Sequence, residues 1–122
     1  MSVPTHLRYS TDHEWLADVA GASTIGITEF AADSLGDIVY VHLPSVGSQL
    51  VAGQSCGEIE SNKTVCDLHT PVSGVVIAVN EDVREDPSLI NRDPYGRGWL
   101  LRISVTEVLK MLSATEYEGL TQ

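Results

Sequence analysis

Turn-forming residues divide most of this chain into short runs, and this spacing constrains the fold more than any other feature of the sequence. Glycine, proline, asparagine and aspartate recur between segments rich in β-branched and apolar residues, as they do between strands joined by turns. In one run Val39, Val41 and Leu43 alternate with Tyr40 and His42, which indicates one buried and one exposed face. The predicted strands are residues 14–19, 23–28, 37–43, 54–61, 65–70, 74–80 and 99–105.

A short helix is predicted between the second and third of these strands. Thr28 is a suitable N-cap for residues 29–35, because its hydroxyl can accept a hydrogen bond from the first helical turn. Gly36 follows directly and is a typical residue for ending a helix.

The C-terminal region is predicted to be helical over about residues 105–120. Apolar residues at 105, 108, 109 and 112 have helical spacing, and Ser113 with Glu116 forms a capping-box pattern before a last helix at 114–120. Many short strands with a helical tail predict a mainly β fold, a small antiparallel sandwich or barrel with short helices. No linker or low-complexity tract interrupts the chain, so one domain of residues 1–122 is expected.

The charge balance restricts the partners of this chain. Seventeen acidic against seven basic residues give a formal net charge of −10, which disfavours nucleic acid and anionic membranes as partners. The acidity suits partners with basic patches, and solubility alone is an equally good explanation. The N-terminus resembles neither a signal peptide nor a transit peptide, and no apolar run is long enough to span a bilayer, so a cytoplasmic protein is expected.

The two cysteines, Cys56 and Cys66, are predicted to be free thiols. Their positions around the intervening turn do not place them opposite each other, and a small domain in a reducing compartment rarely carries a disulfide. Cys66 and His69 have a CxxH spacing, but the sequence supplies no second pair of ligands, so no metal site is expected.

The segment best suited to carry a functional side chain is a predicted hairpin over about residues 54–70. Its strands are joined by a tight turn at residues 62–64, in which Asn62 suits a left-handed backbone and Lys63 stands at the tip. The chain has one other lysine, Lys110. A turn lysine is usually only a solvated charge, but an exposed amine on a flexible stem is also what an acylated carrier arm requires.

The surroundings of Lys63 resemble a known family. The segment GEIESNKTVCDLHTPVSGVVIAVN is similar to the lipoyl-lysine hairpin of glycine cleavage H proteins, and the similarity extends to HEW, IGITEFAADSLGDIVYVHLPSVG and LINRDPYGRGWL. It covers nearly the whole chain in order. Departures from the family pattern occur at Asn62, Thr64, Cys66 and His69. The resemblance implies a lipoyl/biotinyl-type barrel-sandwich hybrid with lipoate attached covalently to Lys63.

Related carriers match less well. Biotin carriers place their lysine between two methionines, and both positions differ in this chain. Lipoyl domains of oxo-acid dehydrogenases usually have Asp-Lys-Ala at the turn and lack the HEW and DPYGRGW segments.

The resemblance also implies a function and a set of partners. The arm of an H protein accepts an aminomethyl group from glycine decarboxylase, a pyridoxal phosphate enzyme, and delivers it to aminomethyltransferase. Dihydrolipoyl dehydrogenase reoxidises the arm, and a lipoyl or octanoyl transferase or ligase attaches it. The carrier itself performs no catalysis and has no catalytic residue, and a monomer is expected because the tip must stay free.

A cationic, water-sensitive cargo suggests that the protein shelters the loaded arm with a carboxylate. Glu14 in the HEW segment is the first candidate for this docking role, followed by Asp67 and Asp12, although each could be an ordinary surface acid. In the DPYGRGW segment, Trp99 is expected to fill core, and Arg97 is a candidate for partner contact.

Two alternative functions remain beside that of a carrier in glycine cleavage. A relay protein that hands lipoyl or octanoyl groups to other lipoyl domains would have a very similar sequence, and the HEW and DPYGRGW segments favour the complete H-protein role. A small enzyme could use Cys66 with His69, or Ser61 with Lys63, but neither pair comes with a third orienting group.

Overall fold

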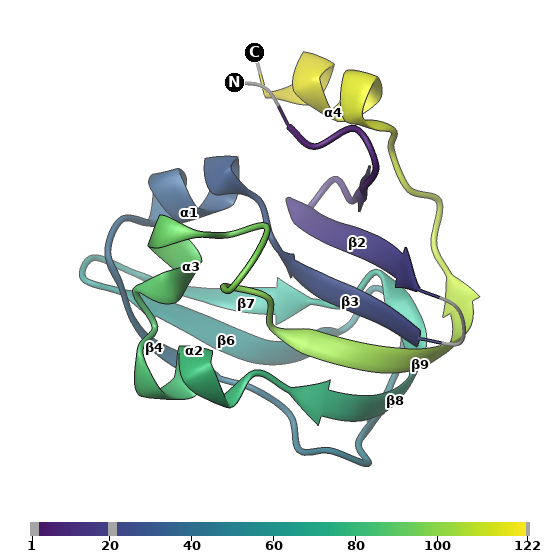
Figure 1. Cartoon of the computed structure of the whole chain (residues 1–122), viewed down its shortest axis with the longest axis horizontal. Coiled ribbons are helices and arrows are strands. Elements are labelled where there is room, and N and C mark those ends of the chain that lie inside the picture. The colour runs from purple at the N-terminus through teal and green to yellow at the C-terminus, as the bar shows by residue number, and fades with distance from the viewer. Residues whose placement is uncertain (1–2, 20–21, 122) are drawn as a thin grey trace.

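The computed structural model describes residues 3–19 and 22–121, which form two antiparallel sheets (Figure 1). In the larger sheet the strand order is β1-β2-β3-β9-β8-β5, with bounds Arg8–Tyr9, Glu14–Val19, Ala22–Ile27, Leu101–Val108, Val72–Val79 and Gln49–Leu50. In the smaller sheet the order is β4-β6-β7, with bounds Ile38–His42, Ser55–Ser61 and Val65–His69. The predicted mainly β fold with short helices is confirmed.

The two sheets share one hydrophobic core. Ile25 and Ile103 from the larger sheet are fully buried, as is Leu68 of the smaller sheet at 1% exposure, and all three belong to the same cluster of contacting side chains. The facing layers therefore stabilise each other by burying their inward residues.

Helices α1 (Glu29–Leu35) and α4 (Ala114–Leu120) form where their caps predicted them. The Thr28 hydroxyl accepts from the Ala31 N–H, and the backbone turns away at Gly36 with φ 90°. The capping box of α4 is complete. Two further helices, α2 (Glu81–Glu85) and α3 (Leu89–Arg92), were not predicted because four or five residues are too few to show a helical period. No described helix is long and apolar enough to cross a membrane.

The prediction of helix over residues 105–112 is wrong. Strand β9 continues to Val108, with Val105 beside Gly74 and Val108 beside Val72 of β8, and the chain then stays extended until Leu112 forms a bridge with Tyr9. The apolar positions do not form a buried stripe, because Val108 is 37% exposed. A free strand edge on β8 therefore decided the conformation, and local periodicity did not.

A bulge in β4 corrects a second detail. The pairing with β6 shifts between Ile38 and Tyr40, so Ile38, Val41 and Leu43 face the core while Val39 is 51% exposed. Val39 therefore does not share a face with Val41 and Leu43 as predicted, because a bulge adds one residue and reverses the alternation on one side of it.

The N-terminal segment and α4 build a second, smaller core beside β2. Its buried members include Tyr9, Trp15 and Tyr117, and Trp99 packs against them while remaining half-buried, which corrects the expectation that Trp99 fills core. The Arg102 guanidinium lies over the Trp99 ring, 4.5 Å from its centroid.

Gly26→Ala is expected to lower the free energy of unfolding by about 1–3 kcal/mol, the usual cost of overpacking. A Cβ at Gly26 would lie 2.6 Å from the ring of Trp15, which is 2% exposed. Gly119→Ala is the control, because nothing lies within 4 Å of its Cβ and alanine favours the helix by up to about 1 kcal/mol. Urea unfolding measures both, and equal effects would contradict this account.

Candidate functional site

The tip of the β6–β7 hairpin is held by a buried serine. The Ser61 backbone N–H donates to the Thr64 carbonyl at 2.8 Å, and its hydroxyl accepts from the N–H groups of Lys63 and Thr64 at 3.3 and 3.2 Å. Asn62 donates its backbone N–H to the Asp37 carbonyl. The expected left-handed conformation at Asn62 is not present, since His13 is the one non-glycine residue with positive φ in the described part of the chain.

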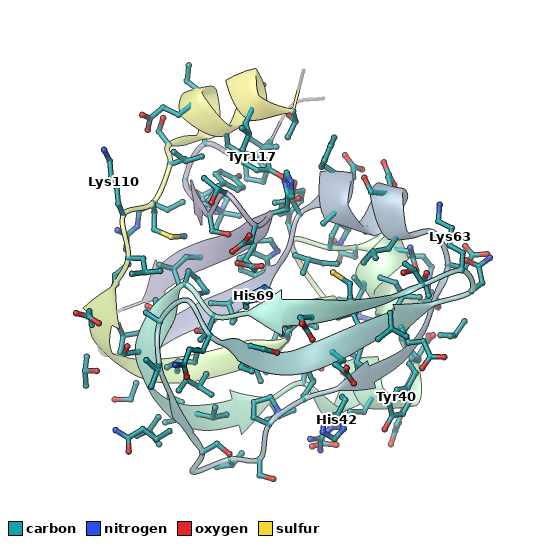
Figure 2. The ribbon with its side chains drawn as sticks, turned by 180° about the vertical axis from the view of Figure 1, so that it is seen from behind. Tyr40, His42, Lys63, His69, Lys110 and Tyr117 are labelled. Carbon is teal, nitrogen blue, oxygen red and sulfur yellow. The ribbon has the colours of Figure 1, made fainter. Side chains whose placement is uncertain are left out.

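Lys63 is exposed at this tip, as predicted, and its side chain lies beside the end of α1 (Figure 2). A Cβ at Gly36 would lie 3.4 Å from Lys63 Cε and 3.0 Å from Asn62 Oδ1. Within the described residues the Lys63 amine makes no ion pair. The stem therefore crosses the glycine that ends α1, and its amine stays available for modification.

The platform beneath the stem is fixed by Asn91 of α3. Its side-chain amide donates to the Gly36 carbonyl at 2.9 Å and accepts from the Ile38 N–H at 2.9 Å. This bridge closes the α1–β4 connection, so the surface that meets Lys63 is held by hydrogen bonds on both sides.

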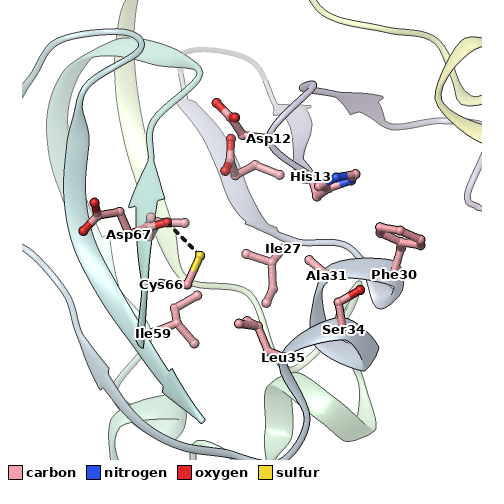
Figure 3. A pocket seen from close by; sticks show the side chains of 12 residues that line it. Asp12, His13, Ile27, Phe30, Ala31, Ser34, Leu35, Ile59, Cys66 and Asp67 are labelled. Carbon is pink, nitrogen blue, oxygen red and sulfur yellow. Dashed lines mark hydrogen bonds between the residues drawn. The ribbon is translucent and has the colours of Figure 1, made fainter. Parts of the chain in front are cut away.

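A pocket of about 240 Å³ lies between α1, β7 and the turn that precedes β2 (Figure 3). All three predicted docking acids line it, although they come from segments far apart in the sequence. Its walls are mainly apolar. The lining residues are Asp12, His13, Glu14, Ile27, Phe30, Ala31, Ser34, Leu35, Ile59, Cys66, Asp67 and Leu68.

Glu14 is the buried acid of this pocket. It is 3% exposed, and the hydroxyl of Ser10 donates to its Oε1 at 2.7 Å. Burial raises the pKa of Glu14 to about 8, the nearby charge of Asp12 adds to the rise, and the Ser10 hydrogen bond opposes it. Asp12 and Asp67 are exposed by contrast, so the pocket combines one desolvated carboxyl group with two solvated ones.

The cysteines are free thiols, as predicted, with Cys66 placed opposite Ile59 on the hairpin. Burial raises the pKa of Cys56 to about 12, and burial followed by the charge of Asp67 raises the pKa of Cys66. Neither is therefore activated as a nucleophile. The described residues contain no group of three side chains that could hold a metal ion, so Cys66 and His69 gain no further ligand.

The Ser61 hydroxyl is committed to the turn, because it also donates to the Thr64 carbonyl at 3.3 Å. It therefore offers no support for an enzyme that uses Ser61 with Lys63. Arg97 is exposed, as a partner-contact residue would be, and its backbone N–H donates to the Asp93 carboxylate at 2.9 Å.

Sequence reasoning missed the side of the pocket formed by α1 and His13. Phe30, Ala31, Ser34 and Leu35 line the pocket on the side of α1, but an amphipathic pattern does not reveal which neighbour a helix will meet. His13 was read as part of the HEW motif and not as a wall of the site.

Glu14→Gln is expected to flatten the dependence of stability on pH. The carboxyl has a pKa of about 8 in the folded chain and an ordinary value of 4.5 otherwise, so the folded state holds a proton that the unfolded state has released. The contribution of Glu14 to the stability of the parent therefore falls as pH rises from about 4.5 to 8. At about 1.36 kcal/mol per pKa unit, the parent should lose on the order of 3 kcal/mol relative to the variant between pH 5 and pH 8. Urea unfolding across this range tests it, and parallel curves would mean an ordinary pKa.

Comparisons with known proteins agree with this arrangement. The profile of the family described as Glycine cleavage H-protein matches residues 7–122. The glycine cleavage system H protein of Beutenbergia cavernae is 51% identical over 121 residues, covering 99% of this chain and 98% of that protein. The H protein of Streptomyces coelicolor is 55% identical over 119 residues, covering 96% and 95%. The crystal structure of a glycine cleavage system H protein from Mycobacterium marinum has a TM-score of 0.93 at 46% identity, covering 96% of this chain and 97% of that one. The chain therefore belongs to the glycine cleavage H-protein family.

Proposed function

We propose that Lys63 carries a lipoyl group on its side-chain amine and that the chain is the lipoyl carrier of a glycine cleavage system. The position of this amine carries the proposal. Lys63 stands exposed at the tip of a hairpin whose inner side contributes Ile59 and Leu68 to the adjoining pocket. Its stem crosses Gly36, the residue directly after Leu35 of the pocket wall. An arm that begins there has an apolar recess with acidic groups beside it.

The residues around Lys63 fit such a group in size and character. The recess holds about 240 Å³, and Ile27, Leu35 and Ile59 offer apolar surface to a hydrocarbon chain. When bound, the lipoyl group supplies a disulfide that takes up and releases a one-carbon amino unit. The protein supplies the attachment point, a docking surface and shelter from water.

Glu14 is the residue that we assign to the cationic end of the cargo. With a pKa of about 8, its carboxyl is largely protonated at pH 7, so the apolar wall does not contain an uncompensated charge. An ammonium group beside it lowers that pKa and replaces the proton as the partner of the carboxylate. The hydroxyl of Ser10 orients the carboxyl through Oε1, while Asp12 and Asp67 add attraction from the rim.

The partners that we propose are glycine decarboxylase, aminomethyltransferase, dihydrolipoyl dehydrogenase and the transferase or ligase that attaches the arm. These enzymes perform the chemistry, and the chain acts as a monomeric, cytoplasmic carrier without catalysis of its own. The net charge of −10 favours basic docking surfaces on each of them, because charge complementarity accelerates short-lived encounters.

Lys63→Arg is expected to abolish lipoylation and carrier activity. Arginine keeps the positive charge but offers no acylable amine, and an exposed turn position should change the free energy of unfolding by no more than about 0.5 kcal/mol. Lys110→Arg is the matched control at the other lysine. Lipoylation removes one positive charge, which takes the formal net charge from −10 to −10 − 1 = −11.

Intact mass and isoelectric focusing after incubation with a lipoyl ligase, lipoate and ATP measure the modification. A lipoyl group on Lys110, or carrier activity that survives in Lys63→Arg, would contradict the proposal.

Glu14→Gln is also expected to shorten the life of the loaded arm at pH 7. The variant keeps the shape of the side chain but cannot become a carboxylate, so the cargo loses one charge-assisted hydrogen bond. That loss corresponds to about tenfold to a hundredfold in the docked fraction. Release of ammonia and formaldehyde from the loaded protein, without aminomethyltransferase, measures it. Asp12→Asn should have a smaller effect, and equal decay of parent and Glu14→Gln would assign Glu14 a purely structural role.

A further inference from the structure

Tyr117 of α4 connects the C-terminal helix to two elements of the arm pocket without lining the pocket itself. Its ring is fully buried and stacks on Tyr9 with centroids 4.7 Å apart. Its hydroxyl lies 2.8 Å from Nδ1 of His13 and 2.7 Å from Oγ1 of Thr28. His13 lines the pocket, and Thr28 caps α1, which supplies Phe30 to the same pocket.

The hydrogen-bonding groups around Tyr117 determine which group each of the Thr28 and Tyr117 hydroxyls donates to. The Thr28 oxygen accepts from the Ala31 N–H, so its own proton needs an acceptor, and the Tyr117 oxygen is the one within reach. The Tyr117 proton is then free to be donated to Nδ1 of His13. The reverse direction would leave the Thr28 proton, in a fully buried side chain, without an acceptor, and that is unfavourable.

The ionisation of both groups supports this direction. Burial raises the pKa of Tyr117 to about 12, so the hydroxyl keeps the proton that it donates. Burial also lowers the pKa of His13, with the charge of Asp12 opposing the change. A neutral His13 that accepts at Nδ1 carries its proton on Nε2.

The backbone of His13 is unusual as well. Its φ of 68° is left-handed, a region that non-glycine residues occupy at a cost. Its carbonyl accepts from the Thr28 N–H at 3.0 Å, and its ring packs against Phe30 with centroids 4.8 Å apart. The ring orientation at the pocket wall therefore depends on contacts from α1 and α4 together.

We propose that Tyr117 is a positioning residue for the arm pocket, which holds His13 in the Nε2–H tautomer and ties the N-cap of α1 to the same hydroxyl. The part of this proposal that concerns the arm rests on the proposed function. It makes the C-terminal helix, which lies outside the pocket, part of the machinery that keeps a loaded arm docked next to Glu14.

Tyr117→Phe tests the tautomer in the protein without a lipoyl group. It removes one hydroxyl and keeps the stacked ring. Tyr9→Phe is the matched control, because Tyr9 is equally buried in the same stack but donates its hydroxyl to the Pro4 carbonyl. Nitrogen-15 NMR of the His13 ring should show an unprotonated Nδ1 and a protonated Nε2 in the parent and in Tyr9→Phe. In Tyr117→Phe the two tautomers should mix. An unchanged spectrum in Tyr117→Phe would overturn the proposal, as would the same change in Tyr9→Phe.

The lipoylated proteins test docking. Decay of the loaded arm should be about two- to tenfold faster in Tyr117→Phe, the effect of losing one neutral hydrogen bond, and unchanged in Tyr9→Phe. In a His13→Ala background, Tyr117→Phe should add little, because its effect passes through His13. If the effects of His13→Ala and Tyr117→Phe on the decay rate were fully additive in the double variant, or if all the proteins decayed equally, the positioning role would be refuted. Failure of Lys63 to take up lipoate would instead refute the carrier function, and the NMR result would still decide the tautomer.

Discussion

The exposed tip of the β6–β7 hairpin depends on how firmly its base is buried. Ile59 and Leu68, on paired strands, are 3% and 1% exposed within the core that both sheets share. These contacts fix the direction of the hairpin, while the Ser61 hydroxyl closes the turn beyond them. The Lys63 side chain therefore projects from a backbone that hydrogen bonds and buried contacts hold in place. The arm that we propose on Lys63 would thus start from a point of attachment fixed relative to its proposed docking site.

The electrostatic character of the pocket is set by the burial of an ionisable group, the Glu14 carboxyl. A desolvated carboxylate is costly, and the molecule avoids this cost by raising the pKa of the side chain until a proton is retained. The same burial makes a carboxylate a strong partner once a cation enters, because surrounding water no longer screens the pair. The burial that makes Glu14 costly to ionise is thus also the property on which its proposed role toward a cationic cargo rests.

Features encoded by a few neighbouring residues could be predicted from the sequence. The caps at Thr28 and Ser113 fixed the starts of α1 and α4, and the run around Lys63 located the hairpin. The helix prediction for residues 105–112 failed because the conformation of this segment depends on pairing with β8, which is distant in sequence. The pocket could be predicted only in part. Glu14 was predicted from the HEW segment and Asp67 from its closeness to Lys63, but the meeting of α1 with β7 is a property of the whole fold.

The two segments that set this chain apart from simpler lipoyl domains are connected physically. Trp15 of HEW donates its indole N–H to the Pro94 carbonyl of DPYGRGW at 2.9 Å. In the same loop the Tyr95 hydroxyl accepts from the Glu29 N–H at the start of α1.

Asn91, just before that loop, fixes the other end of α1 at Gly36. One stretch of chain thus holds the strand that carries Glu14 and both ends of the helix opposite the hairpin. A hairpin alone can present an arm, but a recess that shelters its cargo needs a second wall at a fixed distance. Helix α1 is that wall, and the contacts of Tyr95 and Asn91 hold its two ends in place.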